Sequence, residues 1–414
     1  MSQAIPSIPD FIDTAIVGAG PHGLTLLTHL LQKNKKMRRK MLVFDPSGSW
    51  MTRWQEQFAA LEIPHLRSPA VHHPDPDPFA LRRFAASRPS ELYPPYDLPG
   101  TLLFQEFCQD VVQRWQLQNS VRQATVVRIE PLLNHPYRHL RLWFEDGRSL
   151  VARRVVLAKG SRQINLPKWL DRVPVQIWRD RLCHSSQVDL RKLQLAGERV
   201  LIVGGGLTSG HLALGAMDRG ANVVLMYRRQ FSEKLFDADP GWLGPKYLKN
   251  FWAEFDWHNR WQMIQQARDG GSMTPAIMTQ LRRAHHSAKL EFFEHCQVVD
   301  AQWQGQNWQV CCDDGTSHQF ERIWIATGNQ LDATTEPLLS EVQSVHPVTI
   351  VNGLPVLDSY LRWAGCELFV MGGLAALQVG PTARNLSGAR MASDRIVPAL
   401  AKARMASDRI RRHN

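Results

Sequence analysis

The sequence has 414 residues, of which 44% are hydrophobic and 21% are charged, a composition typical of a globular protein with two or three domains. No apolar stretch is long enough to span a membrane, the first residues lack the pattern of a secretory signal, and the six cysteines form no CxxC pair. We therefore expect no transmembrane segment, disulfide framework or thiol redox centre, and we predict a cytoplasmic protein. The net charge of +11 has no nucleic-acid-binding motif beside it, so we interpret it as a basic surface and expect no nucleic-acid partner.

The first predicted unit is a strand, a glycine-rich turn, a helix and a second strand over residues 12 to about 50. In its turn, VGAGPHG, Gly18 makes the tight bend, Gly20 lets the backbone approach a pyrophosphate, and Gly23 lets the helix pack close to its strand. The free N–H groups at the helix N-terminus favour the anion. The second strand ends at Asp45, whose carboxylate suits a ribose 2′-OH, so this unit predicts an FAD site.

The next segments are a proline-rich irregular stretch (61–100), a helix (102–118) and antiparallel strands (121–132 and 139–160) with a turn at 145–147. The pair His72 and His73 has no third ligand at a sensible spacing. We therefore predict a loop near the flavin rather than a metal site.

A second strand, turn and helix follow in ERVLIVGGGLTSGHLALGA, with Gly204, Gly206 and Ser209 in the three positions. The strand after it ends in Tyr227, Arg228 and Arg229 and has no acid there. Guanidinium groups suit a 2′-phosphate, so we predict NADPH, although a merely solvated strand end would look the same. Two such turns in one chain predict two dinucleotides and electron transfer between them.

The remaining chain predicts a tryptophan-rich helical segment at about 241–290, a strand–turn–strand unit at 296–329 and a terminal helix. We expect the tryptophan-rich helices to pack against the nucleotide domain, the alternative being an apolar pocket or a membrane-facing lip for a lipophilic substrate. The octapeptide ARMASDRI occurs at 389–396 and at 403–410. We interpret the repeat as a local duplication rather than a partner-binding tail.

These motifs, together with the segments GSWMTRW, LAKG, ATG and MGGLAALQVGPTARNLSG, resemble flavin-dependent monooxygenases of the lysine/ornithine N-hydroxylase and flavin-containing monooxygenase type. The sequence is also similar to oxidative-stress-induced growth inhibitor proteins. The resemblance covers roughly residues 12–396. It implies an α/β fold with two Rossmann-like dinucleotide-binding domains, the second inserted in the first. An FAD domain (1–164 plus 323–414) would then enclose an NADPH domain (165–322) carrying the tryptophan-rich insert.

Cofactor contacts are expected first from the two turns and their strand ends: Gly18, Gly20, Pro21, His22, Gly23, Asp45, Pro46, Gly204, Gly206, Leu207, Thr208, Ser209, Arg228 and Arg229. The resemblance implies further contacts by Trp50, Trp54, His65, Leu66, Arg67, Gly160, Thr327, Gly328, Gly373, Leu374, Gly380, Pro381 and Thr382. Pro381 suits a first helical turn, so we expect a helix to begin there and to direct its N-terminus at the flavin N1/C2 carbonyl. Arg67, Ser68 and Asn385 are the catalytic candidates, for positioning nicotinamide or the peroxide.

The resemblance implies that NADPH reduces FAD and that the reduced flavin activates O2 as a C4a-(hydro)peroxide. One oxygen atom would then pass to an N-, S- or carbonyl-type centre of a small organic substrate. The sequence departs from the pattern at Lys159, where the first ATG-like turn has lysine, and it lacks the Asn-x-x-Tyr-Ser segment of amino-acid hydroxylases. Two alternatives stay open: an NADPH-dependent flavin reductase or oxidase acting on a quinone or other acceptor, and a non-catalytic flavin-binding regulatory protein.

Overall fold

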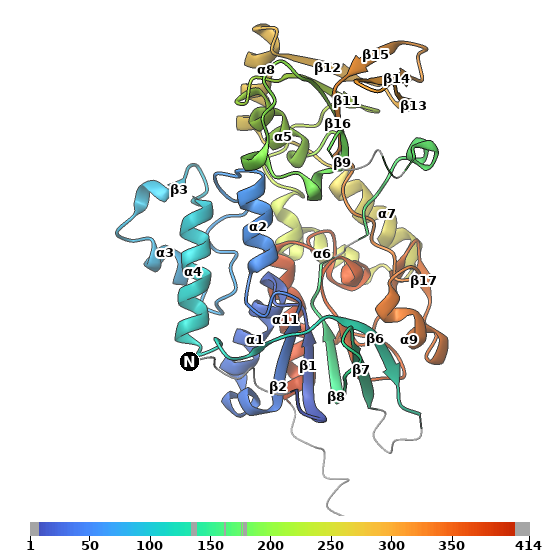
Figure 1. Ribbon diagram of the computed structural model, residues 1–414. Coiled ribbons are helices and arrows are strands. Elements are labelled where there is room, and N and C mark those ends of the chain that lie inside the picture. Colours follow the sequence, from blue (N-terminus) through green and yellow to red (C-terminus); the bar gives the residue numbers. More distant parts are fainter. Residues whose placement is uncertain (1–7, 134–138, 161–162, 175, 177–179, 402–414) are drawn as a thin grey trace, which may run out of the picture.

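The chain folds into two α/β regions that lie one above the other in Figure 1, the first built on a mixed sheet and the second on a parallel sheet. The computed structural model describes residues 8–133, 139–160, 163–174, 176 and 180–401. The second copy of the ARMASDRI repeat lies outside these residues. The predicted α/β fold with two glycine-turn units is confirmed.

The first region is built on a seven-stranded sheet in the order β5-β2-β1-β8-β7-β6, with β19 beside β8. β1, β2, β5, β8 and β19 are parallel, whereas β6, β7 and β8 are antiparallel neighbours. The antiparallel pairing predicted for 139–160 is confirmed. The 121–132 segment, predicted as one antiparallel strand, divides instead into β5, which is parallel to β2, and β6, which is antiparallel to β7. The bounds are β1 (Phe11–Val17), β2 (Met41–Asp45), β5 (Val121–Gln123), β6 (Val126–Pro131), β7 (Leu140–Phe144), β8 (Ser149–Leu157) and β19 (Leu368–Val370).

Helices from both ends of the chain cover this sheet. α1 starts with Pro21 at its first turn, is buried on all sides from Gly23 to Leu31, and lies against α11 (Figure 1). The proline-rich stretch contains only short elements, as its composition predicted. The bounds are α1 (Pro21–Lys33), α2 (Thr52–Ala60), α3 (Ala80–Phe84), β3 (Leu92–Tyr93), β4 (Leu98–Pro99), α4 (Thr101–Arg114), α9 (Ser340–Val345), β17 (Ile350–Val351), β18 (Leu354–Pro355), α10 (Ala376–Val379) and α11 (Leu386–Ala401).

The second region has a five-stranded parallel sheet in the order β12-β11-β10-β16-β9 and a three-stranded antiparallel sheet of β13, β14 and β15. Gly315 has φ 83 at the predicted turn between β14 and β15. The bounds are β9 (Leu182–His184), β10 (Arg199–Val203), α5 (Leu207–Met217), β11 (Asn222–Tyr227), α8 (Pro275–His286), β12 (Leu290–Glu294), β13 (Val298–Trp303), β14 (Trp308–Cys312), β15 (Ser317–Phe320) and β16 (Arg322–Ile325).

The tryptophan-rich helices α6 (Pro245–Ala253) and α7 (Trp257–Arg268) pack against the first region, contrary to expectation. Their side chains Leu248, Phe251 and Ile264 belong to the hydrophobic cluster of the first sheet. The Trp252 indole N–H donates to the Gln378 carbonyl at 3.0 Å. Of the helices in this segment, it is α8 that packs on α5 and β12.

Two further expectations need correction. The predicted limit at 322/323 falls inside β16, which pairs with β10 and β9, so strand pairing puts the end of the second region after residue 325. The helix expected from Pro381 begins at Leu386, because residues 380–385 form a turn in which the Asn385 N–H donates to the Thr382 carbonyl.

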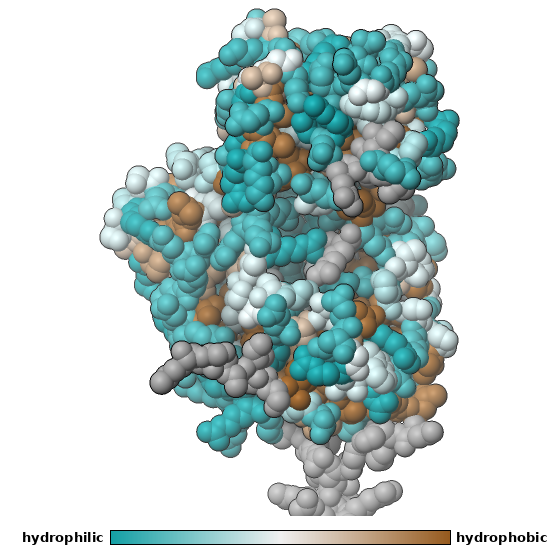
Figure 2. All heavy atoms as spheres, in the orientation of Figure 1, coloured by the Kyte–Doolittle hydropathy of each residue, from teal (hydrophilic) through white to brown (hydrophobic). Residues whose placement is uncertain are grey.

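The two chain connections between the regions run side by side. Ile164 pairs with Asn329 in an antiparallel bridge, and the Asn165 N–H donates to the Gly328 carbonyl at 2.9 Å. The view in Figure 2 is mostly hydrophilic, with hydrophobic residues in small groups. None of the helices in the described residues has the length and apolar character needed to cross a membrane.

Candidate functional site

A cavity of about 740 Å3 lies where the first glycine-rich turn faces the second region. Parallel sheets carry their ligand sites at the carboxyl ends of the strands, and both glycine-rich turns follow such ends. Among the predicted residues, the following line the cavity: Gly18, Gly20, Pro21, His22, Asp45, Trp54, Leu66, Arg67, Ser68, Gly160, Leu207, Gly373, Thr382 and Asn385.

The first turn has the shape that a pyrophosphate needs. Gly18 has φ 109, and a Cβ at Gly23 would overlap the Gly18 carbonyl oxygen, so α1 can approach its strand only because residue 23 is glycine. A Cβ at Gly20 would instead meet no protein atom within 4 Å, which leaves open space beside the N-terminus of α1.

The strand end next to this turn is fixed by backbone contacts. Asp45 accepts a hydrogen bond from the Ala19 N–H at 3.0 Å, which holds its carboxylate at the edge of the cavity. The Met51 N–H donates to the Ala19 carbonyl at 2.8 Å, and Met51 has φ 66. The residues present therefore fit an adenosine diphosphate group, with Asp45 available to the ribose.

The second turn repeats this plan in a more open setting. Gly204 has φ 150 and a Cβ there would overlap the Ala326 carbonyl oxygen, whereas a Cβ at Gly206 would meet nothing within 4 Å. Gly205 packs against the ring of Tyr227. Arg228 and Arg229 are exposed at the end of β11, with Arg229 Nη1 3.6 Å from an Asp269 carboxylate oxygen.

Arg67 ties the two regions together and has no N–H left to donate in this arrangement. Its Nε donates to the Leu235 carbonyl at 2.9 Å, Nη1 to the Ser272 carbonyl and to Asp237, and Nη2 to the Lys234 carbonyl and to Ser272 Oγ. All five N–H groups are thus engaged. The predicted role of Arg67, positioning nicotinamide or the peroxide, would require it to give up one of these contacts.

Asp237 gathers three guanidinium groups at the cavity. Its Oδ1 lies 3.0 Å from Arg67 Nη1, and its Oδ2 lies 2.7 Å from Arg268 Nη2 and 3.9 Å from Arg384 Nη2. Burial raises the pKa of Asp237, but Arg268, Arg384 and Arg67 lower it further, so the carboxylate is ionised. We call these four residues the Asp237 cluster.

Three histidines beside these elements are neutral at physiological pH. Burial lowers the pKa of His22 to about 4, against a hydrogen bond to the Arg384 carbonyl. Burial, with the neighbouring His65, also lowers the pKa of His211 to about 4. Burial lowers the pKa of His72 as well, and its Nδ1 lies 3.0 Å from Ser68 Oγ at the cavity wall.

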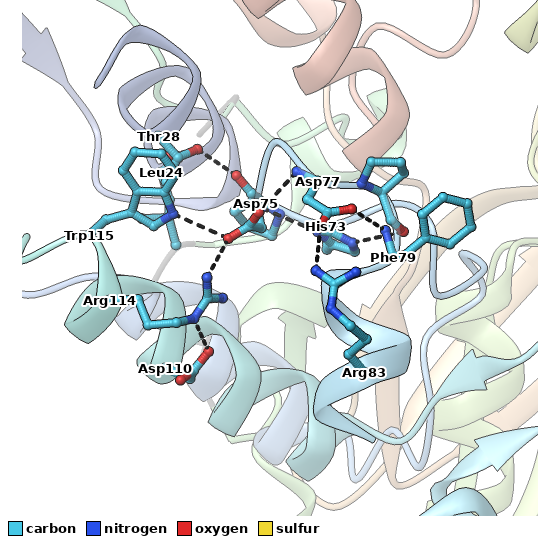
Figure 3. A network of polar contacts seen from close by, with 12 residues as sticks. Leu24, Thr28, His73, Asp75, Asp77, Phe79, Arg83, Asp110, Arg114 and Trp115 are labelled. Atoms are coloured by element: carbon cyan, nitrogen blue, oxygen red, sulfur yellow. Dashed lines mark hydrogen bonds and ion pairs between the residues drawn. The ribbon is translucent and has the colours of Figure 1, made fainter. Parts of the chain in front are cut away.

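The loop with the two adjacent histidines is a packed structural element. Figure 3 shows Asp75 accepting hydrogen bonds from Arg114 Nη1 at 2.9 Å and from the Trp115 indole at 3.2 Å, while its backbone N–H donates to His73 Nδ1 at 3.2 Å. The Thr28 hydroxyl of α1 donates to the Pro74 carbonyl at 2.5 Å. Within the described residues, no group of three His, Cys, Asp or Glu side chains could hold a metal ion.

Several predicted contact residues lie away from the cavity lining. Trp50 is buried in the core, where its indole N–H donates to the Leu117 carbonyl at 3.0 Å, so it is not free to lie against a flavin from within the cavity. Thr327 and Gly328 instead bind Asn165 in the inter-region connection. The others outside the lining are Gly23, Pro46, His65, Gly204, Gly206, Thr208, Ser209, Arg228, Arg229, Leu374, Gly380 and Pro381.

The lysine that departs from the family pattern has a local explanation. Lys159 Nζ lies 2.8 Å from an oxygen of Glu336, whose side chain is 8% exposed, and Lys159 also lines the cavity. Neither this pair nor the Asp237 cluster was predicted. Their members come from separate segments, and only the folded chain brings them together.

Comparison with known proteins agrees with this architecture. Residues 15–162 match a family model described as FAD-NAD(P)-binding, and no curated protein matches the sequence. The ornithine hydroxylase of Pseudomonas aeruginosa superposes with a TM-score of 0.76 at 16% identity, over 94% of this chain and 99% of that one. The ornithine N-hydroxylase of Kutzneria sp., in a complex with reduced FAD, NADP+ and L-ornithine, gives 0.76 at 17% identity over 94% and 99%.

A disulfide reductase shares the fold less closely. The bacillithiol disulfide reductase of Bacillus cereus gives a TM-score of 0.61 at 15% identity, over 94% of this chain and 99% of that one. At these identities the likeness establishes the fold alone, which this chain shares with the ornithine hydroxylases and with the reductase.

Proposed function

We propose that the protein is an FAD- and NADPH-dependent monooxygenase that transfers one oxygen atom from O2 to a small organic substrate. The observation that carries the proposal is the cavity, because the open space at Gly20, the Asp45 carboxylate and the first residue of α5 all border the same volume. The similarity in fold to ornithine hydroxylases across nearly the whole chain supports the same reading.

In this proposal the first turn holds FAD. The α1 N-terminus and Gly20 receive the pyrophosphate, and Asp45 accepts the ribose hydroxyl. The helix α11 begins at Leu386 on the cavity wall, next to Asn385 and Ser387, so its N-terminus is available to stabilise negative charge on the flavin ring. Bound flavin would supply the redox and oxygen chemistry, and the protein supplies binding, orientation and exclusion of water.

The second turn would hold NADPH. Gly206 receives its pyrophosphate at the N-terminus of α5, and the exposed Arg228 and Arg229 bind the 2′-phosphate. Ser68 and Asn385 stay as predicted positioning residues. Ser68 contacts His72, which is part of the same wall, so its hydroxyl has a fixed neighbour within the cavity. On this division the FAD domain comprises the first sheet and both chain ends, and the NADPH domain comprises the second and third sheets.

Rapid-mixing absorbance tests the proposal. The FAD-loaded protein is reduced by NADPH without oxygen and then mixed with oxygenated buffer. A transient near-ultraviolet band before the oxidised flavin spectrum returns is the expected result. Direct return without such a band, in the presence of each amine, thioether and ketone tried, would favour a reductase or oxidase. Failure of NADPH to reduce the flavin would contradict both enzymatic functions and leave a flavin-binding regulator.

A further inference from the structure

The cavity wall contains a cation that the proposed cofactor sites do not use. Arg384 lies in the turn before α11, lines the cavity, and has a side chain that is 48% exposed. Asp237 is the one carboxylate within 4.0 Å of its guanidinium in the described residues, and that contact is long, at 3.9 Å.

The same carboxylate is already neutralised by other partners. Arg67 and Arg268 lie 3.0 and 2.7 Å from its two oxygens, and their side chains are only 12% and 15% exposed. Three guanidinium groups around one carboxylate leave the Asp237 cluster with a net charge of +2. Burial, together with the nearby Arg268, lowers the pKa of Arg384 to about 10, so this side chain remains cationic at neutral pH.

The surroundings of Arg384 differ from a dinucleotide turn. The connection from β11 to α6 contributes Phe236, Ala238 and Leu243 to the lining, and Tyr96 lies opposite, its ring centroid 5.3 Å from that of Phe236. Phe236 and Ala238 flank Asp237 in the chain, so the guanidinium that approaches Asp237 lies near this apolar part of the wall, while the Arg384 carbonyl lies 3.4 Å from His22 Nε2 of the first glycine-rich turn. A wall of this kind suits the hydrocarbon part of a ligand, and the guanidinium suits its anionic end.

We propose that this part of the cavity is the substrate subsite and that it selects an organic acid with an apolar body, whose carboxylate binds Arg384. The inference rests on the proposed function only in describing the bound acid as the substrate. The subsite itself depends only on the cavity and the Asp237 cluster.

Binding of matched acids and amides tests the subsite without any turnover. The FAD-loaded, oxidised protein is titrated calorimetrically with 3-phenylpropionate and octanoate, and with the corresponding neutral amides. We expect each acid to bind at least about tenfold more tightly than its amide, because loss of a charge-assisted hydrogen bond is worth a factor of this order. If neither acid binds more tightly than its amide, the proposal is overturned.

Variants assign the preference to Arg384. R384Q should bind acid and amide equally, and R384K should keep most of the preference because it keeps the charge. R282Q removes an exposed cation from α8, where Arg282 pairs with Glu233 at 3.0 Å, and should bind like the unchanged protein. An acid preference that survives in R384Q would overturn the proposal. So would a change in the NADPH Michaelis constant as the only effect of R384Q.

Failure of NADPH to reduce FAD would instead contradict the proposed function. The two failures can be told apart because the titrations use neither NADPH nor oxygen.

Discussion

The two glycine-rich turns follow the same plan but differ in what surrounds them. In the first, open space at Gly20 belongs to a cavity bordered by Asp45, whose carboxylate is held by the Ala19 N–H. In the second, Gly205 packs on the Tyr227 ring and the basic strand end is exposed. The first turn borders a cavity of about 740 Å3, whereas the basic strand end beside the second turn is exposed to solvent.

This difference matches the two roles that the proposed reaction requires. A site within a cavity contacts more of the ligand and suits a cofactor that remains bound through many turnovers. An open site allows exchange after each hydride transfer, as a cosubstrate must. The comparison teaches that similar turn sequences do not by themselves distinguish a resident dinucleotide from an exchanging one, because the distinction comes from residues outside the turn.

The largest effect should come from alanine at the closely packed glycines. In Gly23→Ala and Gly204→Ala the new methyl group would overlap a backbone carbonyl oxygen, so we expect the free energy of unfolding to fall by about 3 kcal/mol. Urea unfolding measures this change. Alanine is the better helix former at position 23, so unchanged stability of Gly23→Ala would mean that the close contact between α1 and its turn is absent.

Alanine at Gly20 or at Gly206, where a Cβ would meet no protein atom, should weaken binding of one dinucleotide at a time. Gly20→Ala meets no protein atom, so the protein should fold normally and bind FAD about tenfold more weakly. Gly206→Ala should keep its FAD and raise the NADPH Michaelis constant by a similar factor. Flavin content after gel filtration and steady-state flavin reduction distinguish them. Equal loss of flavin in both variants would remove the assignment of one dinucleotide to each turn.

Removal of the positive charges at the end of β11 should reduce the preference for NADPH over NADH. With both Arg228 and Arg229 changed to Gln, we expect the Michaelis constant for NADPH to rise about tenfold and that for NADH to change little. Stopped-flow reduction with each nucleotide measures the preference. R282Q, which removes one exposed positive charge elsewhere on the same region, again serves as the control. A similar loss for both nucleotides would indicate a general effect on binding.

The smallest effect concerns pH, and it compares the two helices. The folded-state pKa of His22 on α1 and that of His211 on α5 are lowered from 6.5 to about 4. The unfolded chain therefore binds more protons between these values, and stability is lost as the pH falls from 6.5 towards 4. Unfolding free energies at about pH 7.5 and about pH 5 should differ less in His211→Gln than in the unchanged protein. His258→Gln, at an exposed position on α7, is the control and should leave the difference unaltered.

The sequence predicted the parts of the fold that depend on local spacing. Both glycine-rich turns, the strand ending at Asp45 and the antiparallel β6-β7-β8 segment follow from residues close together in the chain. The start of α11 was predicted five residues too early, because the preference of Pro381 for a first helical turn is overridden by the turn at 380–385.

Contacts between distant segments could not be predicted in this way. Arg67, Asp237 and Arg384 meet from the proline-rich stretch, the connection after β11 and the turn before α11. None of these segments has a periodic pattern that fixes its path. Trp50 was placed against the flavin by resemblance, yet the Leu117 carbonyl that binds its indole lies in another loop, which the pattern around Trp50 does not reveal.

The arrangement of β19 and α11 has a consequence for synthesis on the ribosome. β19 (Leu368–Val370) pairs with β8, and α11 covers α1, so the first sheet lacks a strand and a covering helix until nearly the whole chain has emerged. The second sheet needs only residues 182 to 325. At roughly 5–20 residues per second, the later-encoded region can therefore close several seconds before the earlier one, which reverses the usual N-terminal order and leaves the α11-facing side of α1 uncovered during that interval.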